Sequence, residues 1–380
     1  MRRRIFTEDH ELFRETVRAF CEKECLPYVE EWRQTGYAGR EVWLKAGEAG
    51  LLGWEVPEEF GGSGISDFRY NAIVAEEFVT SGAGGPAFAL NNDVVLPYLL
   101  ALASDEQKQR WLPGMVTGEV IWAIAMSEPG TGSDLKSLST TALREGDEFV
   151  VNGAKTFISS GRTATHVIVA AKTDPAAGHK GISLLVVEDE MPGFGRGRQL
   201  DKIGNEAADT SELFFEDVRV PAHNLLGEPG KGFYALMRNL PRERMGIAVH
   251  GVARAARALA ITTDYARDRK AFGQPIGSFQ ANRFSLAELK TKVDVAQVFV
   301  DRCLEELLAG ELSAEDAAEA KLFVTETEWE VLDRCLQLHG GYGYINEYEI
   351  ARLWRDGRVQ RVYGGTSEIM KEIIGRSMGF

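Results

Sequence analysis

The chain has 380 residues, of which 44% are hydrophobic and 26% are charged, a composition typical of a folded globular protein with two or three subdomains. Its formal net charge of −14, without any long run of lysine and arginine, argues against nucleic-acid binding. No apolar stretch approaches the roughly 20 residues of a membrane span, four cysteines are too few for a disulfide framework and six histidines are scattered, so we expect a cytoplasmic protein without a metal site.

Apolar residues recur at three- and four-residue spacing through the first third of the chain. Near the start, Leu12, Phe13, Val17 and Phe20 follow this spacing, which is typical of an amphipathic helix. The pattern predicts helices at 7–33, 41–49, 68–79, 94–103 and 106–115, interrupted by the turn-rich stretches EEFGGSGISD and TSGAGGP. We therefore predict an α-helical domain over residues 1–119.

The pattern changes near Val120. Short runs rich in β-branched and aromatic residues follow, each bounded by Gly, Asp or Pro: VIWAIAM, EFVVNG, KTFIS, HVIVAAKT, GISLLVVE and ELFFEDVRV. Because no predicted helix separates these runs, an antiparallel barrel or sandwich is favoured over a parallel sheet. We predict a β-barrel domain over residues 120–232.

Long periodic segments return after Gly232, at 241–268, 282–309 and 314–339. They predict a helical bundle over residues 233–380, with Pro241 suited to the first turn of its leading helix. The predicted fold class is α+β, in the order helical domain, antiparallel β-barrel and helical bundle.

Five motifs occur along the chain in the order AMSEPGTGSD, KTFISSG, RKAFGQPIGSFQ, QLHGGYGY and YGGTSEI. Together with the predicted domain order, they resemble the acyl-CoA dehydrogenase family over nearly the whole chain, and most closely its long-chain branch. The resemblance implies an FAD-dependent enzyme of fatty acid β-oxidation that converts acyl-CoA thioesters into trans-2-enoyl-CoA. It also implies that the electrons pass to an electron-transfer flavoprotein, and that the enzyme is a homotetramer built as a dimer of dimers.

The stretch AMSEPGTGSD leaves a predicted strand and enters a loop with two glycines and several hydroxyl groups. Such a backbone can approach a flat ring closely and offer N–H groups, which suits a flavin. By resemblance, Met126, Ser127, Gly132 and Ser133 bind FAD, and Ser133 also lies near the acyl-CoA. On the residues alone, a plain turn at a strand end is an equal alternative.

The stretch KTFISSG places an aromatic residue two positions before a hydroxyl residue. A strand would direct Phe157 and Ser159 to the same face. By resemblance, Phe157 packs on the flavin face away from the substrate and Ser159 hydrogen-bonds near N5, the atom that receives the hydride. An ordinary buried phenylalanine is the alternative.

The stretch RKAFGQPIGSFQ places a cation, an aromatic ring and an amide around a Gly-Pro turn. Arginine suits a pyrophosphate because its planar group makes paired hydrogen bonds to phosphate oxygens. By resemblance, Arg269, Phe272 and Gln280 reach the FAD of a neighbouring subunit, as do Gln337 and Gly341 of QLHGG. A surface arginine at a helix end is the alternative.

Thr366 and Glu368 open the last predicted helix, TSEIMKEIIGR. A helix start offers free N–H groups and a partial positive charge, so both residues are candidates for contact with the cofactor. Thr366 is equally suited to be a simple N-cap, and the two roles are compatible.

The stretch VYGGTSEIM has Gly364 where many members of the family carry a glutamate that removes the substrate's α-proton. The long-chain and isovaleryl branches carry this glutamate on an earlier helix, and LPRERMGIA matches that location with Glu243. By resemblance, Glu243 is the catalytic base, Arg244 supports the substrate pocket, and Tyr363 and Gly364 line it.

On the residues alone, Glu243 has a different interpretation. Pro241 would place it in a first helical turn, where the positive helix end and nearby arginines lower the pKa of a carboxylate. A solvated acid paired with an arginine is the ordinary fate of such a residue. For catalysis, desolvation by the bound acyl chain must oppose that lowering.

Glycine at position 364 also removes bulk from the predicted cavity, and Gly84, Gly85 and Pro86 lie near its bottom by resemblance. We therefore expect long or branched acyl chains. Two other functions stay open. One is an oxygen-using flavin oxidase or monooxygenase on the same fold. The other is a catalytically silent binding subunit, which Gly364 favours and Glu243 opposes.

Overall fold

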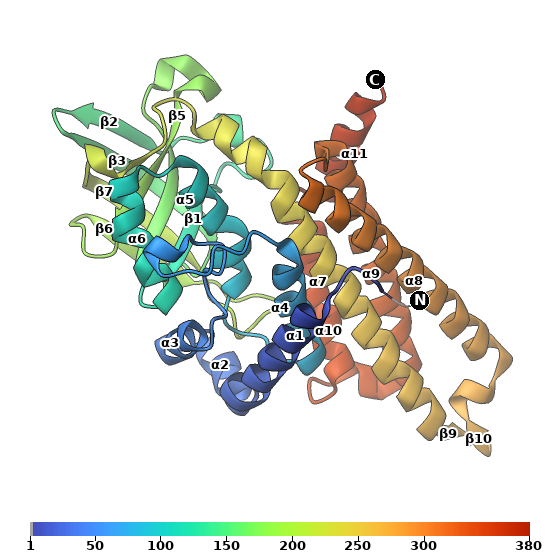
Figure 1. Cartoon of the computed structure of the whole chain (residues 1–380). Helices are drawn as coiled ribbons and strands as arrows, with labels where there is room; N and C mark the ends of the chain where they lie inside the picture. The colour runs from blue at the N-terminus through green and yellow to red at the C-terminus, as the bar shows by residue number, and fades with distance from the viewer. Residues whose placement is uncertain (1–2) are drawn as a thin grey trace.

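The computed structural model describes residues 3–380, which form helices, then a sheet, then helices again along the chain (Figure 1). The first helices are α1 (Glu8–Phe20), α2 (Val29–Thr35), α3 (Arg40–Glu48), α4 (Phe68–Ser81), α5 (Leu96–Leu102) and α6 (Asp105–Thr117). The helix predicted over 7–33 is divided by a π-helical turn at Cys21–Cys25. Pro27 follows this turn and has no N–H with which to continue the helical ladder.

The middle part is one sheet of eight strands: β1 (Trp122–Ala125), β2 (Thr141–Glu145), β3 (Glu148–Ser159), β4 (His166–Lys172), β5 (Ile182–Glu188), β6 (Phe194–Gln199), β7 (Thr210–Pro221) and β8 (Leu225–Leu226). The strand order is β6-β7-β3-β2-β4-β5-β8, and β1 pairs with β4. Strands β1 and β2 run parallel to β4. The predicted antiparallel β-barrel is therefore wrong, because the sheet is not closed and two of its pairings are parallel.

The sheet buries its apolar side chains without closing. In β4, Ile168 belongs to a core shared with α5 and α6, whereas its neighbour Val167 belongs to a core shared with β3 and β7. In β5, Leu184 and Leu185 divide between the same two cores. Strands buried on both faces have continuous apolar sequences, which explains the runs at β4 and β5. Strand β6 was missed because FGRGRQ has a low β-propensity.

The C-terminal part consists of five helices: α7 (Gly232–Asp268), α8 (Gln280–Ala309), α9 (Ala314–His339), α10 (Glu349–Gly357) and α11 (Ser367–Ser377). A small hairpin, β9 (Lys270–Ala271) and β10 (Gln274–Pro275), joins α7 to α8. Helix α7 begins beside β5 and then packs against α4, α8 and α9 (Figure 1). It is therefore the element that connects the sheet to the helical bundle.

The prediction that Pro241 starts a helix is wrong. Helix α7 begins nine residues earlier, at Gly232, so Pro241 and Glu243 lie in its interior. The helix continues through the proline because both its ends and its flanks are packed against other elements. Glu243 is consequently not exposed to the positive end of the helix.

A second π-helical turn, Leu90–Val95, leads into α5. Its residues Asn91, Asn92, Asp93 and Val94 hydrogen-bond in succession to β1, the loop after α3, α4 and α7. Turns of this type widen a helix and are frequent at functional sites. Here the turn fixes the N-terminal helices, the sheet and α7 relative to one another.

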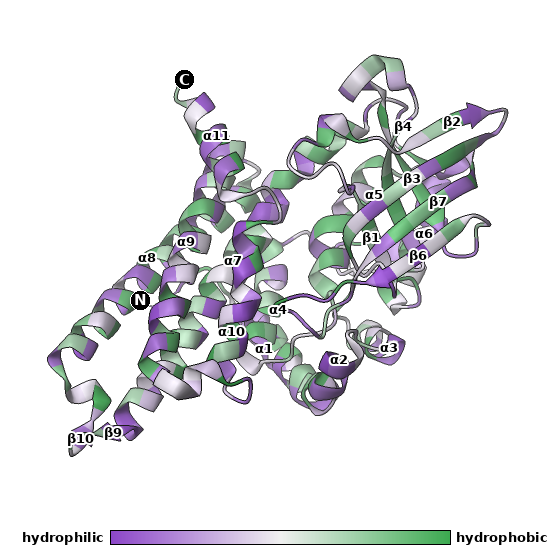
Figure 2. Cartoon of the chain, turned by 180° about the vertical axis from the view of Figure 1, so that it is seen from behind, coloured by the Kyte–Doolittle hydropathy of each residue, from purple (hydrophilic) through white to green (hydrophobic). Residues whose placement is uncertain are grey.

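Seen from behind in Figure 2, the outer strands β2 and β6 carry hydrophilic segments, whereas β4 and β5 are the strands with continuous buried apolar sequences, and the helices mix hydrophobic and hydrophilic turns. This is expected for strands buried on both faces and for helices buried on one. Within residues 3–380, no helix is long and apolar enough to cross a membrane.

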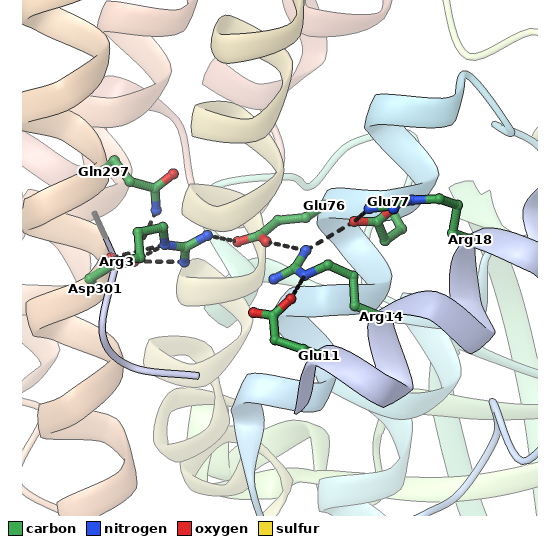
Figure 3. A network of polar contacts seen from close by, with 8 residues as sticks. All are labelled: Arg3, Glu11, Arg14, Arg18, Glu76, Glu77, Gln297 and Asp301. Atoms are coloured by element: carbon green, nitrogen blue, oxygen red, sulfur yellow. Dashed lines mark hydrogen bonds and ion pairs between the residues drawn. The ribbon is translucent and has the colours of Figure 1, made fainter. Parts of the chain in front are cut away.

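A network of charged side chains joins the segment before α1 to α4 and α8 (Figure 3). Arg3 donates to Asp301 at 2.7 Å and lies 2.5 Å from Glu76. Arg14 donates to Glu76 at 2.8 Å and to Glu77 at 3.0 Å. The side chains of Glu76 and Glu77 are only 11% and 6% exposed, so arginines compensate two largely buried carboxylates.

Candidate active site

Glu243 lies in the interior of α7 and is 8% exposed. Its Oε1 accepts a 2.9 Å hydrogen bond from the Tyr98 hydroxyl of α5 and a 3.1 Å hydrogen bond from Nδ2 of Asn239. The same amide lies 3.3 Å from the Val94 carbonyl oxygen. In the described part of the chain, Oε2 accepts no hydrogen bond, so one carboxylate oxygen is held and the other is free.

Burial raises the pKa of Glu243 above its ordinary value, although the hydrogen bonds from Tyr98 and Asn239 and the charge of Arg244 lower it. Within residues 3–380, Glu243 forms no ion pair with a cation. A carboxylate with a raised pKa and one free oxygen is suited to accept a proton. Sequence reasoning missed Tyr98, because no local pattern links a tyrosine to a carboxylate 145 residues away. It also missed Asn239, although the four-residue spacing to Glu243 on a helix was an available signal.

The turn at Gly364 faces α7. Gly364 has φ 64°, and a side chain there would place its Cβ 2.3 Å from Cδ1 of Ile247. The left-handed backbone opposes a larger residue at this position, and such a residue also requires the flexible end of the Ile247 side chain to move. The space expected beside Gly364 is therefore filled by Ile247, and a carboxylate cannot replace Gly364 without local rearrangement.

Two buried cationic side chains, Arg244 and Lys321, contact the backbone carbonyl groups of this turn. Arg244 Nε lies 3.4 Å from the Gly364 carbonyl oxygen, and Lys321 Nζ lies 2.5 Å from that of Gly365. Burial, followed by the charge of Arg244, lowers the pKa of Lys321 to about 8. The neighbouring Tyr363 is 45% exposed and donates to Gln360 at 2.7 Å, so its ring is available to a ligand.

The predicted loop after β1 is confirmed. Glu128 and Thr131 exchange two backbone hydrogen bonds, which leaves Gly132 and Ser133 exposed beyond a tight turn. An added Cβ at Gly132 would have no atom within 4 Å. Exposed backbone of this kind can accept a flat or charged group.

A buried ion pair that sequence reasoning missed connects this loop to β3. Lys155 Nζ donates to Glu128 at 2.9 Å and to the Met126 carbonyl oxygen at 3.0 Å. Burial by itself would raise the pKa of Glu128. The hydrogen bonds from Ser139 and Thr140 and the charge of Lys155 outweigh this effect and lower the pKa of Glu128 to about 2. A lysine inside a predicted buried strand was the available signal, since such a residue requires a partner.

Phe157 and Ser159 of β3 are exposed to solvent. Thr156, which precedes Phe157, and Ile158, which lies between the two exposed residues, are buried. Phe157 is 69% exposed and has φ 60°, at a register shift of the strand between Lys155 and Ile158. Residues in unfavourable backbone conformations of this kind cluster at functional sites, which makes Phe157 a candidate. The predicted common face is confirmed, and the ring is available to stack on a flat ligand.

Arg269, Gln337 and Gly341 line one cavity of about 510 Å³ at the far end of α7. Phe272 is 95% exposed at the turn of the β9–β10 hairpin, and Gln280 is exposed at the start of α8. Because α7 rises about 1.5 Å per residue, this end lies roughly 40 Å from Glu243. The structure therefore does not bring these five residues to the Glu243 site of the same chain.

Thr366 is the N-cap of α11 and accepts a 3.3 Å hydrogen bond from the Ile369 N–H. Glu368 is exposed in the first turn. The predicted helix start is confirmed. Within residues 3–380, no cluster of His, Cys, Asp and Glu is arranged to hold a metal ion.

The chain matches three profiles, described as the acyl-CoA dehydrogenase N-terminal domain over residues 7–119, the middle domain over 123–218 and the C-terminal domain over 230–379. It is 46% identical to the long-chain specific acyl-CoA dehydrogenase of Rattus norvegicus over 99% of this chain and 88% of the relative. It is 38% identical to the 3-(aryl)acrylate reductase of Clostridium sporogenes over 98% of this chain and 99% of the relative.

The structure is similar to that of an acyl-CoA dehydrogenase from Geobacillus kaustophilus, with a TM-score of 0.97 and 47% identity over 99% of both chains. It is also similar to a glutaryl-CoA dehydrogenase from Mycobacterium smegmatis in complex with FADH2, with a TM-score of 0.91 and 26% identity over 99% of this chain and 95% of the other. The chain belongs to the acyl-CoA dehydrogenase family, whose members are FAD-dependent oxidoreductases.

Proposed function

We propose that the chain catalyses the FAD-dependent α,β-dehydrogenation of acyl-CoA thioesters to trans-2-enoyl-CoA, with Glu243 as the base. The observation that carries the proposal is the environment of Glu243. This carboxylate is buried, its pKa is raised, and neutral donors hold only one of its oxygens. A charged arginine partner would instead lower its basicity.

In the proposed reaction, Oε2 of Glu243 takes the α-proton of the thioester. FAD, when bound, accepts the hydride that leaves the β-carbon, so the substrate loses one proton and one hydride and gains a double bond. Tyr98 and Asn239 keep Oε1 in place while the proton moves to Oε2. The raised pKa brings the base nearer to neutral pH, where proton transfer is most efficient.

The residues around the loop after β1 fit an isoalloxazine ring. The open Gly132, the exposed Ser133 and the exposed Phe157 can supply backbone N–H groups, a hydroxyl group and an aromatic face to such a ring. We assign Met126, Ser127, Gly132, Ser133, Phe157 and Ser159 to FAD. Ser133, Arg244, Tyr363 and Gly364 are assigned to the substrate.

We further propose a homotetramer in which a second chain completes each FAD site. The distance along α7 supports this, since the cavity of Arg269, Gln337 and Gly341 is remote from Glu243. Arg269, Phe272, Gln280, Gln337 and Gly341 would then contact the partner's FAD, with Thr366 and Glu368 at the same cofactor. The protruding, exposed Phe272 fits a contact with another chain.

For the substrate we propose long acyl chains and, for the electrons, an electron-transfer flavoprotein, which places the enzyme in fatty acid β-oxidation. The similarity to the long-chain relative supports the chain length. The Ile247 side chain lies beside Gly364 and leaves less space for bulky branched acyl groups. Rapid reoxidation of the reduced flavin by air with product bound would favour the oxygen-using alternative.

The test is anaerobic mixing of the FAD-loaded protein with a panel of acyl-CoAs, followed by flavin bleaching. Glu243→Gln keeps the shape of the side chain and removes the base, so we expect bleaching at least about 10²-fold slower. The variant should still hold FAD and bind acyl-CoA. Bleaching of the variant at the wild-type rate would exclude Glu243 as the base, and no bleaching of the loaded wild type would favour the silent-subunit alternative.

A further inference from the structure

A polar recess lies between α4, the Leu90–Val95 turn and α7, one helical turn beyond Glu243. We call it the Asp93 recess and define it by Phe68, Asn71, Asp93 and Gly246. Asp93 is 5% exposed, and its Oδ1 accepts a 2.7 Å hydrogen bond from Nδ2 of Asn71. Among residues 3–380, its Oδ2 accepts no hydrogen bond.

Gly246 faces this oxygen across a position that few other atoms line. Apart from its chain neighbours and its own helix backbone, an added Cβ at Gly246 would have two atoms within 4 Å: Oδ2 of Asp93 at 3.3 Å, closer than most Cβ contacts, and Cζ of Phe68 at 4.0 Å. Most buried Cβ positions are closely surrounded, because protein interiors are densely packed. A carbon atom at this position would therefore crowd Oδ2, whereas a hydroxyl group can approach a carboxylate oxygen to about 2.7 Å because it donates a hydrogen bond to it.

The surroundings of the recess are polar and incompletely satisfied. Arg242 forms an ion pair with Glu55 and lies 4.9 Å over the ring of Phe68, yet its Nε has no partner, and neither has Oδ1 of Asn71. Burial raises the pKa of Asp93 to about 7, while Asn71 and Arg242 lower it and Glu55 raises it. Buried polar atoms normally have partners, so the recess is suited to receive a hydrogen-bonding group.

The recess is positioned along the proposed path of the substrate. Gly246 follows Glu243 by three residues, so the two lie on neighbouring positions of one helix face, roughly 4.5 Å apart along the axis. Glu243 acts at the α-carbon. An acyl chain that continues along α7 reaches the level of Gly246 after a few carbon–carbon bonds.

Given the dehydrogenase function proposed above, we propose that Asp93 determines specificity by accepting a hydrogen bond from a hydroxyl group on the acyl chain. The preferred substrates are then hydroxyacyl-CoA thioesters whose hydroxyl lies a few carbons beyond the α-carbon. The hydroxyl takes no part in the redox step. A plain chain at the recess leaves the carboxylate without a partner, which disfavours it.

The test uses pairs of saturated acyl-CoAs of equal length, one plain and one with a single hydroxyl at successive positions beyond the β-carbon. Anaerobic flavin reduction by the FAD-loaded wild type should show a kcat/KM about 10- to 100-fold higher for the best hydroxylated partner. Asp93→Ala should bring this ratio close to one. Its FAD content and thermal unfolding serve as folding controls.

Gly246→Ala is the complementary variant, because it fills the recess and keeps the carboxylate. It should also lower the ratio, mainly by weakening the hydroxylated substrate. If both variants change the two substrates equally, Asp93 is structural and the inference fails. A wild type that prefers the plain chain at every position would mean that the recess holds only ordered water, which also overturns it.

A binding measurement separates this inference from the proposed function. In Glu243→Gln, which should not turn over, the dissociation constants of the paired acyl-CoAs are obtained from the shift of the flavin spectrum. The hydroxylated partner should bind about 10-fold or more tightly, and adding Asp93→Ala should abolish the difference. If no acyl-CoA reduces the wild-type flavin, the proposed function fails, whereas equal dissociation constants would refute the role of Asp93 alone.

Discussion

The carboxylates of Glu76, Glu77 and Glu243 are all buried, but their partners differ. Arginines from α1 and the preceding segment compensate Glu76 and Glu77 (Figure 3), whereas a tyrosine and an asparagine hold Glu243. The first arrangement keeps charge in place and ties helices together. The second leaves a carboxylate that can gain and lose a proton, which is what a base requires. The chemistry of the partner therefore distinguishes a structural acid from a candidate catalytic one.

The largest effect is expected when the carboxylate is moved from position 243 to position 364. Glu243→Gly combined with Gly364→Glu should reduce flavin about 10² to 10⁴ times more slowly than the wild type, because Ile247 occupies the space that the new side chain needs. Anaerobic stopped-flow measurements test this. Adding Ile247→Ala should recover part of the rate. Full activity of the double variant would show that position 364 accepts a base without rearrangement.

A second change tests a compensated acid in the loop after β1. Lys155→Met leaves Glu128 buried without its cation, so we expect the free energy of unfolding to fall by about 3–5 kcal/mol. Chemical denaturation measures the loss. The control is Lys155→Met with Glu128→Gln, which removes the uncompensated charge and should restore much of the stability. Equal stability of the single variant and the wild type would contradict the importance of this pair.

A third change probes the arginine-compensated acids themselves. Glu76→Gln should lower the free energy of unfolding by about 1–3 kcal/mol, because Arg3 and Arg14 each lose a charged partner. Flavin reduction should stay at the wild-type rate. Glu11→Gln in α1 is a matched control, since Glu11 also pairs with Arg14 but is 57% exposed and should matter little. A large loss of flavin reduction in Glu76→Gln would contradict a purely structural role for the arginine-compensated acids.

The smallest expected effect concerns the pH profile. Tyr98→Phe removes a donor that favours the charged form of Glu243, so the pKa of Glu243 should rise further and the ascending limb of flavin reduction should move to higher pH. Rates from mildly acidic to alkaline pH measure this. A uniform loss of rate without a shift of the limb would indicate that Tyr98 only packs.

The raised pKa of Glu243 should also make the free energy of unfolding depend on pH, in a direction that can be stated. The pKa of Glu243 is raised in the folded protein, so the folded state retains a proton that the unfolded chain has lost. Its contribution to the free energy of unfolding is full below the ordinary glutamate pKa and declines as the pH rises through the raised value. Glu243→Gln should remove this decline. The pKa of Glu128 is lowered, so its contribution is lost only when the pH falls toward about 2.

Much of the fold could be predicted because its signals are local. The helices around Glu41, Phe68 and Glu106 and the strands at β4 and β5 follow from periodicity and β-propensity. Closure of the sheet and the true start of α7 were predicted incorrectly, since both depend on packing between distant segments. The domain boundaries at 119 and 232 and the individual FAD contacts stay predictions.

The sequence by itself determined the order of helical and β segments, the family and the candidate base, because periodicity and motif spacing are properties of short stretches. Only the tertiary structure decided that Tyr98 and Asn239 hold Glu243, that Ile247 occupies the space beside Gly364, and that Asp93 faces a gap at Gly246. Apart from the contact of Asn239, which lies four residues before Glu243 on α7, these contacts join residues far apart in the chain. Their geometry depends on how α4, α5 and α7 pack, and no local pattern encodes that arrangement.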